Sequence, residues 1–331
     1  MSSLNQYRGR FAPSPTGPLH FGSLAAAVGS YLDAKKHNGI WLVRIEDLDA
    51  PRCVPGAADD ILRTLEVFGL HWDESVIYQS QRTNAYEEAL LRLQSIGAAY
   101  PCACTRKEVS DSALHGIEGP VYPGTCRNGV PAGREGRAWR VRTDLTPSPL
   151  TGEGWGEGES LKHPLSPNPS PARGEGCIEF DDALQGHLTQ HLETEIGDFV
   201  VKRADDLFAY QLAVVVDDAF HGITHIVRGA DLLLSTARQI HLQRLLGLNT
   251  TAYMHLPIAV NAQGEKLSKQ TLAPAITTDD IVATLIAVLE FLRQQPPAEL
   301  RQGSVEEVLA WAIKNWQPER MKGCRQLATP K

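Results

Sequence analysis

Apolar residues recur along the first hundred positions at spacings that switch between those of strands and those of helices. Residues 7–11 and 41–47 have the alternation and composition of short strands. Residues 23–36, 56–69 and 81–95 gather apolar side chains on one helical face. This β-α-β-α order predicts an α/β fold with a parallel, doubly wound Rossmann-like sheet, in which ligands bind at the carboxyl ends of the strands.

The second half of the chain mixes short strands and helices in the same way. Strands are expected at 199–203, 207–210 and 255–260, and helices at 279–293 and 304–316. The first two ranges flank Ala204-Asp-Asp, which predicts a hairpin turn. Ser304 followed by Glu307 is a capping box and marks a helix start. In the earlier strand at 41–47, the alternation places Arg44 and Glu46 on the same face.

Composition divides the chain further. The segments are the first half of the α/β domain at 1–100, a Cys- and Gly-rich zinc-binding insertion with the start of an acceptor-binding subdomain at 101–143, an insert at 144–176, the second half of the domain at 177–273, and a C-terminal helical subdomain at 274–331. The third segment is dense in Pro, Gly and Ser and buries too little apolar area to offset chain entropy, so we expect it to be disordered.

Overall composition limits the class of protein. The chain is 42% hydrophobic and 21% charged, as in an ordinary globular protein. It has neither an apolar run long enough to span a membrane nor a signal peptide at its start, which predicts a cytoplasmic location. A net charge of −7 argues against indiscriminate coating of nucleic acid but permits a local basic track that contacts one RNA.

Two segments carry the residues expected to hold a nucleoside triphosphate. They are Arg10-Phe-Ala-Pro-Ser-Pro-Thr-Gly-Pro-Leu-His20-Phe-Gly22-Ser and Lys266-Leu-Ser268-Lys269-Gln. The first places His20 and Gly22 where a Pro/Gly turn meets a helix N-terminus, which favours bound phosphate. Lysines of the second can neutralise a phosphate during its transfer. Taken alone, His20 could be a capping residue and the lysine loop a solvated one.

Together these segments resemble the HIGH and KMSKS motifs of class I aminoacyl-tRNA synthetases. The resemblance implies that His20, Gly22, Ser268 and Lys269 bind ATP. It also implies that His20, Gly22, Lys266 and Lys269 contribute to catalysis. Lys269 is the better choice for the catalytic contact, although Gln270 stands where that family usually has Ser.

Longer stretches resemble the glutamyl-tRNA synthetase group. These are the first motif, Arg44-Ile-Glu46-Asp, Phe208-Ala-Tyr210, Val214-Val-Val-Asp-Asp and Ile226-Val-Arg228-Gly-Ala-Asp. The resemblance implies a glutamate site formed by Arg10, Phe11, Ala12, Pro13, Ser14, Glu46, Tyr210 and Arg228. The chemistry agrees, since a dianionic amino acid needs two cations and a carboxylate for its ammonium group. Three of these residues also have a purely structural alternative: Glu46 could pair with Arg44 or Arg10, Tyr210 could be a core residue, and Arg228 could hold Asp231.

Three clustered cysteines form a candidate zinc site. Cys102, Cys104 and Cys126 lie in a segment with little means of forming an apolar core, and thiolates are preferred zinc ligands. Chemistry alone leaves the fourth ligand open, because His115 and Asp111 lie between the cysteines. The glutamyl-Q branch of the synthetase group has Cys-x-Cys and Tyr-x-x-x-Cys as its ligand set, which implies Tyr122.

The length of chain after Leu272 bears on the acceptor. It allows one small helical subdomain, whereas glutamyl-tRNA synthetases carry a long anticodon-reading region. The chain therefore resembles the glutamyl-Q branch, which implies tRNA-independent activation of L-glutamate with ATP and Mg²⁺. The implied acceptor is queuosine in the anticodon stem-loop of tRNA(Asp), and the protein is expected to act as a monomer. Three alternatives remain: a truncated glutamyl- or glutaminyl-tRNA synthetase charging a 3′ end, a non-catalytic tRNA- or amino-acid-binding paralogue, and another nucleotidyl transferase.

Overall fold

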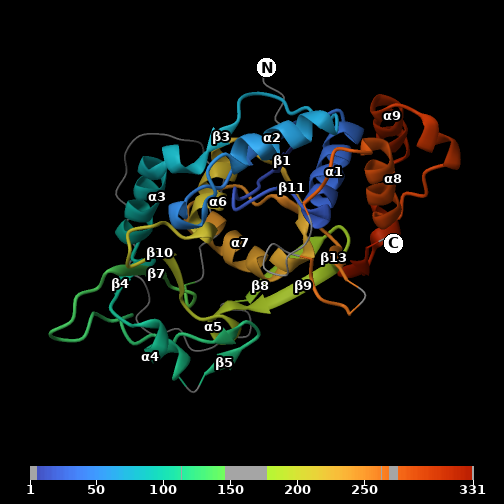
Figure 1. The fold of residues 1–331 in the computed structure, drawn as a ribbon. Coiled ribbons are helices and arrows are strands. Elements are labelled where there is room, and N and C mark those ends of the chain that lie inside the picture. The colour runs from blue at the N-terminus through green and yellow to red at the C-terminus, as the bar shows by residue number, and fades with distance from the viewer. Residues whose placement is uncertain (1–5, 113, 146–176, 262, 268–274, 330–331) are drawn as a thin grey trace.

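The computed structural model describes residues 6–112, 114–145, 177–261, 263–267 and 275–329 (Figure 1). The expected insert at 144–176 therefore lies almost wholly outside the described residues, as do Ser268 and Lys269 of the lysine loop. No helix in the described ranges is both long and apolar enough to cross a membrane.

A parallel sheet organises the first half of the chain. Its elements in chain order are β1 (Arg8–Phe11), α1 (Phe21–Lys36), β2 (Ile40–Ile45), α2 (Ala57–Val67), β3 (Ile77–Tyr78) and α3 (Thr83–Ser95). β1 pairs in parallel with β2, and β2 pairs in parallel with β3. The helices predicted at 23–36, 56–69 and 81–95 are confirmed to within two residues at each end. Elements of this length and order form the first half of a doubly wound fold.

The second half adds further parallel strands beside β1. Its elements are β8 (Cys177–Asp182), β9 (Gly186–His191), α5 (Leu192–Glu195), α6 (Tyr210–Phe220), β11 (His225–Gly229), η3 (Ala230–Ser235), α7 (Thr236–Leu245) and β12 (Ala252–Leu256). β11 pairs in parallel with β12, which pairs with β8, and β9 is antiparallel to β8. Thr224, just before β11, exchanges hydrogen bonds with Arg8 of β1. The two halves therefore meet at β1 and β11.

The predicted single strand at 255–260 is wrong. β12 ends at Leu256 and a separate strand, β13 (Ile258–Val260), begins after Pro257. Proline has no N–H to donate to a ladder, so it separates the two strands. β13 then pairs in parallel with β14 (Gln326–Ala328), from the far end of the chain.

The insertion forms a second, antiparallel layer. It contains β4 (Ala99–Cys102), α4 (Arg106–Ser110), β5 (His115–Gly116), β6 (Gly119–Pro120) and β7 (Ala138–Val141), and it is joined by β10 (Phe199–Lys202). β7 lies between β4 and β10. The turn predicted at Ala204-Asp-Asp is confirmed, since Arg203 N donates to Leu207 O. Its second arm is only a single bridge, Lys202 to Phe208, because α6 begins at Tyr210.

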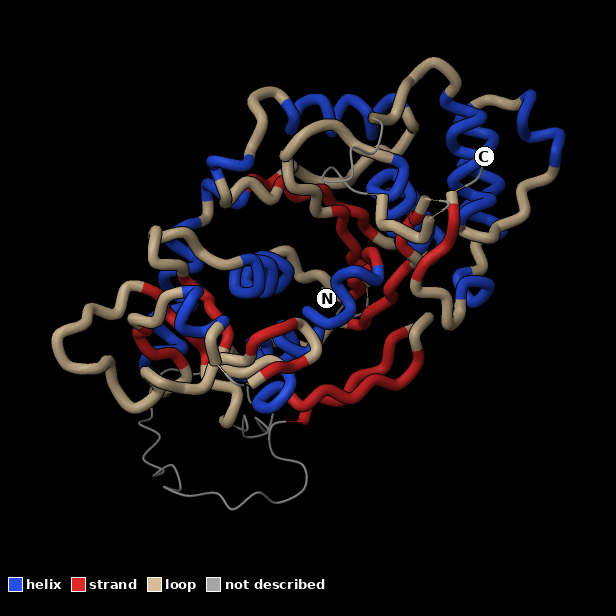
Figure 2. Tube along the Cα trace, turned by 60° about the horizontal axis from the view of Figure 1, so that its bottom comes forward, coloured by secondary structure: helices blue, strands red, loops and turns tan. Residues whose placement is uncertain are grey.

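Two helices pack at the end of the molecule that lies away from the antiparallel sheet of β4, β7 and β10 (Figure 1). α8 (Ile281–Phe291) and α9 (Val305–Asn315) pack on α1 in one hydrophobic cluster. The Trp316 indole reaches α1 directly and donates to Asp33 at 2.9 Å. The capping box predicted at Ser304 and Glu307 is confirmed. Both views show these helices far from β4, β7 and β10 (Figures 1 and 2).

Candidate active site

A pocket of about 690 Å³ opens where the parallel strands end. The described residues of the expected ATP and glutamate sites all line it, and they are Arg10, Phe11, Ala12, Pro13, Ser14, His20, Gly22, Glu46, Tyr210, Arg228 and Lys266. Segments separated by more than two hundred positions along the chain therefore share one cavity. Its position agrees with the rule that open α/β sheets bind ligands at the carboxyl ends of their strands.

His20 caps the N-terminus of α1 and also lines the pocket. Its Nδ1 accepts from the Ser23 N–H at 3.3 Å, and the Ser23 hydroxyl exchanges a hydrogen bond with the His20 backbone. The capping alternative and the pocket role are therefore compatible. A Cβ at Gly22 would lie 3.3 Å from the His20 ring, so glycine keeps this ring and the helix mouth in close contact. The N-terminus of α1 lies beside the pocket, where its positive dipole and the N–H groups outside this cap can attract an anion.

Next to the pocket, two buried arginines, Arg10 and Arg44, share one carboxylate. Asp218 of α6 accepts from Arg10 Nε at 3.1 Å and from Arg44 Nη1 at 2.7 Å. Arg44 also contacts Glu46 at 3.3 Å, which confirms that Glu46 pairs with an arginine while its side chain still lines the pocket. Burial raises the pKa of Asp218, but Arg10 and Arg44 outweigh it and lower the value to about 2. Burial raises the pKa of Glu46 despite the same arginines.

Asp217, the neighbour of Asp218, anchors α6 to α3 and to the turn that precedes α3. Its carboxylate accepts from Gln79 at 2.8 Å, Arg82 at 2.5 Å and the Tyr86 hydroxyl at 2.8 Å. The side chain is fully buried. Arg44 lies between the two aspartates, at 3.9 Å from Asp217 and 2.7 Å from Asp218, and their other partners differ. These contacts fix the rotation of α6, whose first residue, Tyr210, lines the pocket.

Arg228 is held differently from Arg10. Its Nε donates to His255 Nε2 at 3.0 Å and its Nη2 to Thr236 Oγ1 at 2.9 Å, and Nη1 lies 3.5 Å from the Tyr210 hydroxyl. The alternative that Arg228 holds Asp231 is wrong: among the described residues these two side chains form no ion pair, and Asp231 is instead contacted by Lys266 Nζ at 2.7 Å. This second pair brings the start of the lysine loop against the strand end that carries Arg228.

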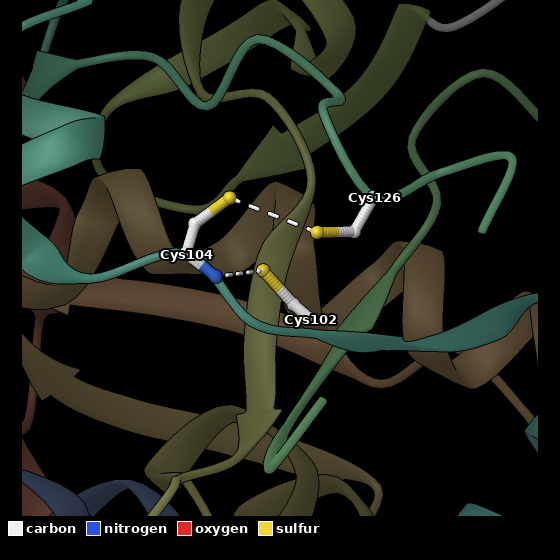
Figure 3. Close-up of side chains that lie close together, drawn as sticks. All are labelled: Cys102, Cys104 and Cys126. Carbon is white, nitrogen blue, oxygen red and sulfur yellow. Dashed lines mark hydrogen bonds between the residues drawn. The ribbon is translucent and has the colours of Figure 1, made fainter. Parts of the chain in front are cut away.

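The three cysteines of the insertion point toward one another (Figure 3). The sulfur atoms of Cys102, Cys104 and Cys126 lie within 4.8 Å of each other. The Tyr122 hydroxyl completes the group, at 3.4 Å from Cys102 Sγ and 3.7 Å from Cys104 Sγ. Within the described part of the chain, His115 does not belong to this cluster. The donor set, three thiolates and one oxygen, has the four ligands of a tetrahedral metal site.

Arg140 contacts two members of this cluster, Cys102 and Tyr122. Its Nε donates to Cys102 Sγ at 3.4 Å, and its guanidinium lies 3.9 Å from the centre of the Tyr122 ring. Burial raises the pKa of Cys102, but hydrogen bonds from Tyr122, the Cys104 N–H and Arg140 lower it overall. A lower pKa favours the thiolate, the form that binds metal.

The sequence as a whole matches a known protein family. The model of class I tRNA synthetases (E and Q), catalytic domain, matches residues 6–127 and 170–292. A glutamyl-Q tRNA(Asp) synthetase of Dechloromonas aromatica is 57% identical over 312 residues, covering 94% of each chain. Proteins of the same name from Chromobacterium violaceum and Thiobacillus denitrificans are 54% and 52% identical over 95% and 97% of each chain.

The chain belongs to the glutamyl-Q tRNA(Asp) synthetase family. The resemblance drawn from its motifs is thereby confirmed. A solved glutamate-tRNA synthetase from Elizabethkingia anophelis has a TM-score of 0.73 and 23% identity, covering 98% of this chain and 68% of that one. This structure shows the class I tRNA synthetase fold, which agrees with the parallel α/β sheet observed here.

Several residues of the site were missed in the sequence. Asp217 and Asp218 entered only as part of a family motif, and His255 only as the start of a strand. Arg44 was expected on the same strand face as Glu46, as a possible partner for it, but not as a partner of Asp218. Adjacent aspartates inside an apolar helical stretch were a usable signal, because buried carboxylates require partners. Which arginines those partners were could not be derived, since Arg10 and Asp218 lie 208 positions apart.

Proposed function

We propose that this protein activates L-glutamate with ATP, without tRNA, and transfers it to the cyclopentenediol of queuosine at the anticodon wobble position of tRNA(Asp). The observation that carries the proposal is the shared pocket, in which a helix N-terminus, Arg228, Glu46 and Lys266 converge. Membership of the glutamyl-Q tRNA(Asp) synthetase family supports the choice of amino acid and acceptor.

In the first step a glutamate carboxylate oxygen attacks the α-phosphorus of ATP and pyrophosphate leaves, giving glutamyl-adenylate. Both reactants are anionic, so the protein supplies positive potential and alignment. We assign Arg228 and Arg10 to the substrate carboxylates, and Glu46 to its ammonium group. The remaining substrate contacts proposed are Phe11, Ala12, Pro13, Ser14 and Tyr210.

We assign ATP to the N-terminus of α1 and to the lysine loop. His20 and the first turn of α1 would receive phosphate oxygens, with Gly22 leaving room beside the His20 ring. Lys266, Ser268 and Lys269 would neutralise the phosphates, and Mg²⁺ would accompany ATP as substrate. In the second step a queuosine hydroxyl attacks the activated carbonyl carbon and AMP leaves.

The acceptor separates this proposal from a glutamyl-tRNA synthetase that charges a 3′ end. We expect an isolated tRNA(Asp) anticodon stem-loop carrying queuosine to accept radiolabelled glutamate, because queuosine has a cis-diol like that of a terminal ribose. Stem-loops treated with periodate, or lacking queuosine, should accept none. Efficient charging of tRNA(Glu) at its 3′ adenosine would instead establish a minimal glutamyl-tRNA synthetase.

We also propose one structural zinc ion held by Cys102, Cys104, Tyr122 and Cys126. Zinc prefers four ligands in tetrahedral geometry, and structural sites stabilise the segment that supplies them. Metal analysis of purified protein should give one zinc per chain, and Cys104→Ser should lose it. Tyr122→Phe should weaken zinc binding, whereas His115→Ala should not. The opposite pattern for these last two variants would assign the fourth position to His115.

A further inference from the structure

A line of buried polar groups runs from the inside of the sheet to the pocket. Asp182 ends β8, His255 lies in β12 and Arg228 lies in β11. The Asp182 and His255 side chains are fully buried. His255 Nδ1 lies 2.6 Å from Asp182 Oδ2, and His255 Nε2 accepts from Arg228 Nε at 3.0 Å. Neighbouring parallel strands thus place a carboxylate, an imidazole and a guanidinium in series.

The hydrogen bonds fix the tautomer of the imidazole. Arg228 Nε always carries a proton, so His255 Nε2 must be the acceptor and Nδ1 must carry the ring proton. Burial lowers the pKa of His255 to about 4, which keeps the ring neutral. Asp182 completes the arrangement by accepting the Nδ1 proton.

The other oxygen of Asp182 is occupied by the backbone. Oδ1 accepts N–H groups from Leu184 at 3.0 Å, Gln185 at 2.9 Å and His255 at 3.3 Å. Burial raises the pKa of Asp182, but His255 and these N–H groups outweigh it and lower the value. The carboxylate is therefore ionised, and Oδ2 is the atom directed at the ring.

This support leaves the charge of Arg228 uncompensated. Arg10 and Arg44 are bound by the Asp218 carboxylate, whereas Arg228 is bound by the neutral His255 ring and the Thr236 hydroxyl. Within the described residues, no carboxylate lies within ion-pair distance of Arg228. A guanidinium fixed by neutral acceptors keeps both its orientation and its full attraction for an incoming carboxylate.

We propose that His255 and Asp182 are positioning residues for Arg228, which they present to the substrate carboxylate as a fixed, uncompensated cation. Neither touches substrate. The assignment of the ligand rests on the proposed function, whereas the orientation of Arg228 does not.

Asp182→Asn tests this inference by reversing one hydrogen bond. The amide oxygen remains with the three backbone N–H groups, so the amide NH₂ faces His255 Nδ1. The ring must then carry its proton on Nε2, opposite Arg228 Nε–H, so the hydrogen bond between Arg228 and the ring is lost. Thr236 Oγ1, at 3.3 Å from Nε2, could accept this proton only in competition with Arg228 Nη2. We expect the KM for glutamate in pyrophosphate exchange to rise about 10- to 100-fold, by analogy with the loss of groups that orient metal-ligating side chains. The KM for ATP should change little.

Two further variants isolate the mechanism. His255→Gln can donate to Asp182 and accept from Arg228, so its KM for glutamate should stay within a few-fold of wild type, whereas His255→Leu should behave like Asp182→Asn. Asp181→Asn is the matched control, because Asp181 binds His187 at 2.9 Å in a neighbouring exposed pair. Its kinetics should match wild type.

Nitrogen NMR of the histidine rings gives a readout that needs no substrate. The His255 signals, identified by their loss in His255→Gln, should show an unprotonated Nε2 in wild type and a protonated Nε2 in Asp182→Asn. A protonated Nε2 in wild type, or an unchanged glutamate KM in a folded Asp182→Asn protein, would overturn the inference. If wild type lacks glutamate-dependent exchange, the proposed function fails, and the ring tautomer still decides the positioning of Arg228.

Discussion

Replacing Asp218 with asparagine is expected to lower the free energy of unfolding by about 3–5 kcal/mol, the range for removing one partner of a buried ion pair. Asp218 holds Arg10 and Arg44, and all three side chains are at most 3% exposed. An amide cannot compensate two guanidinium charges that remain out of water. Urea unfolding of both proteins at neutral pH measures the difference.

The loss should depend on pH in a defined direction. The pKa of Asp218 is lowered to about 2 in the folded protein, against about 3.9 for an unperturbed aspartate. Its stabilisation is therefore complete above about pH 4 and is lost as pH falls toward 2. The gap between wild type and Asp218→Asn should narrow over this interval. Asp206→Asn, at a carboxylate that is 90% exposed, is the control and should cost little. A gap that stays constant with pH would contradict the assigned ion pairs.

Lys269→Ala is expected to reduce glutamate-dependent exchange of pyrophosphate into ATP by about 10²–10³-fold, the usual cost of losing one contact that stabilises charge in a transition state. The wild-type protein should carry out this exchange with no tRNA present. Lys269 lies outside the described residues, and the prediction rests on its place in the lysine loop. Unfolding curves should confirm that the variant remains folded.

Lys314→Ala is the matched control, since this lysine is exposed on α9, away from the pocket lining. It should exchange pyrophosphate at the wild-type rate. Near-normal exchange by Lys269→Ala, or wild-type exchange that requires tRNA, would contradict the assignment of the loop.

Local features of the fold were predictable because they depend on neighbouring residues. α1 was predicted from residue 23 and begins at Phe21, since His20 caps the helix two residues earlier than the apolar pattern suggests. The three cysteines were grouped correctly because their spacing is short. The Tyr122 hydroxyl joins them across a loop, and only family resemblance indicated it.

The pocket depends on contacts that no local pattern contains. Alternation in β2 placed Arg44 on the face opposite Trp41 and Ile45, yet Arg44 is as fully buried as they are. A parallel strand in a doubly wound fold is covered on both faces, so alternation loses its usual meaning there. The partner of Arg44 comes from α6, and that of Arg228 from β12. Such pairings are decided by the order of strands in the sheet.

The pairing of β13 with β14 has a consequence for protein synthesis. β13 carries Ile258 and Ala259, which line the pocket, and it leads directly to Lys266. Isolated two-stranded pairs are marginal in water, and β13 has no other described ladder partner. Because the ribosome builds the chain from its N-terminus, β13 emerges well before residues 326–328. A nascent chain therefore lacks the ladder that completes this wall of the pocket until β14 has left the ribosome.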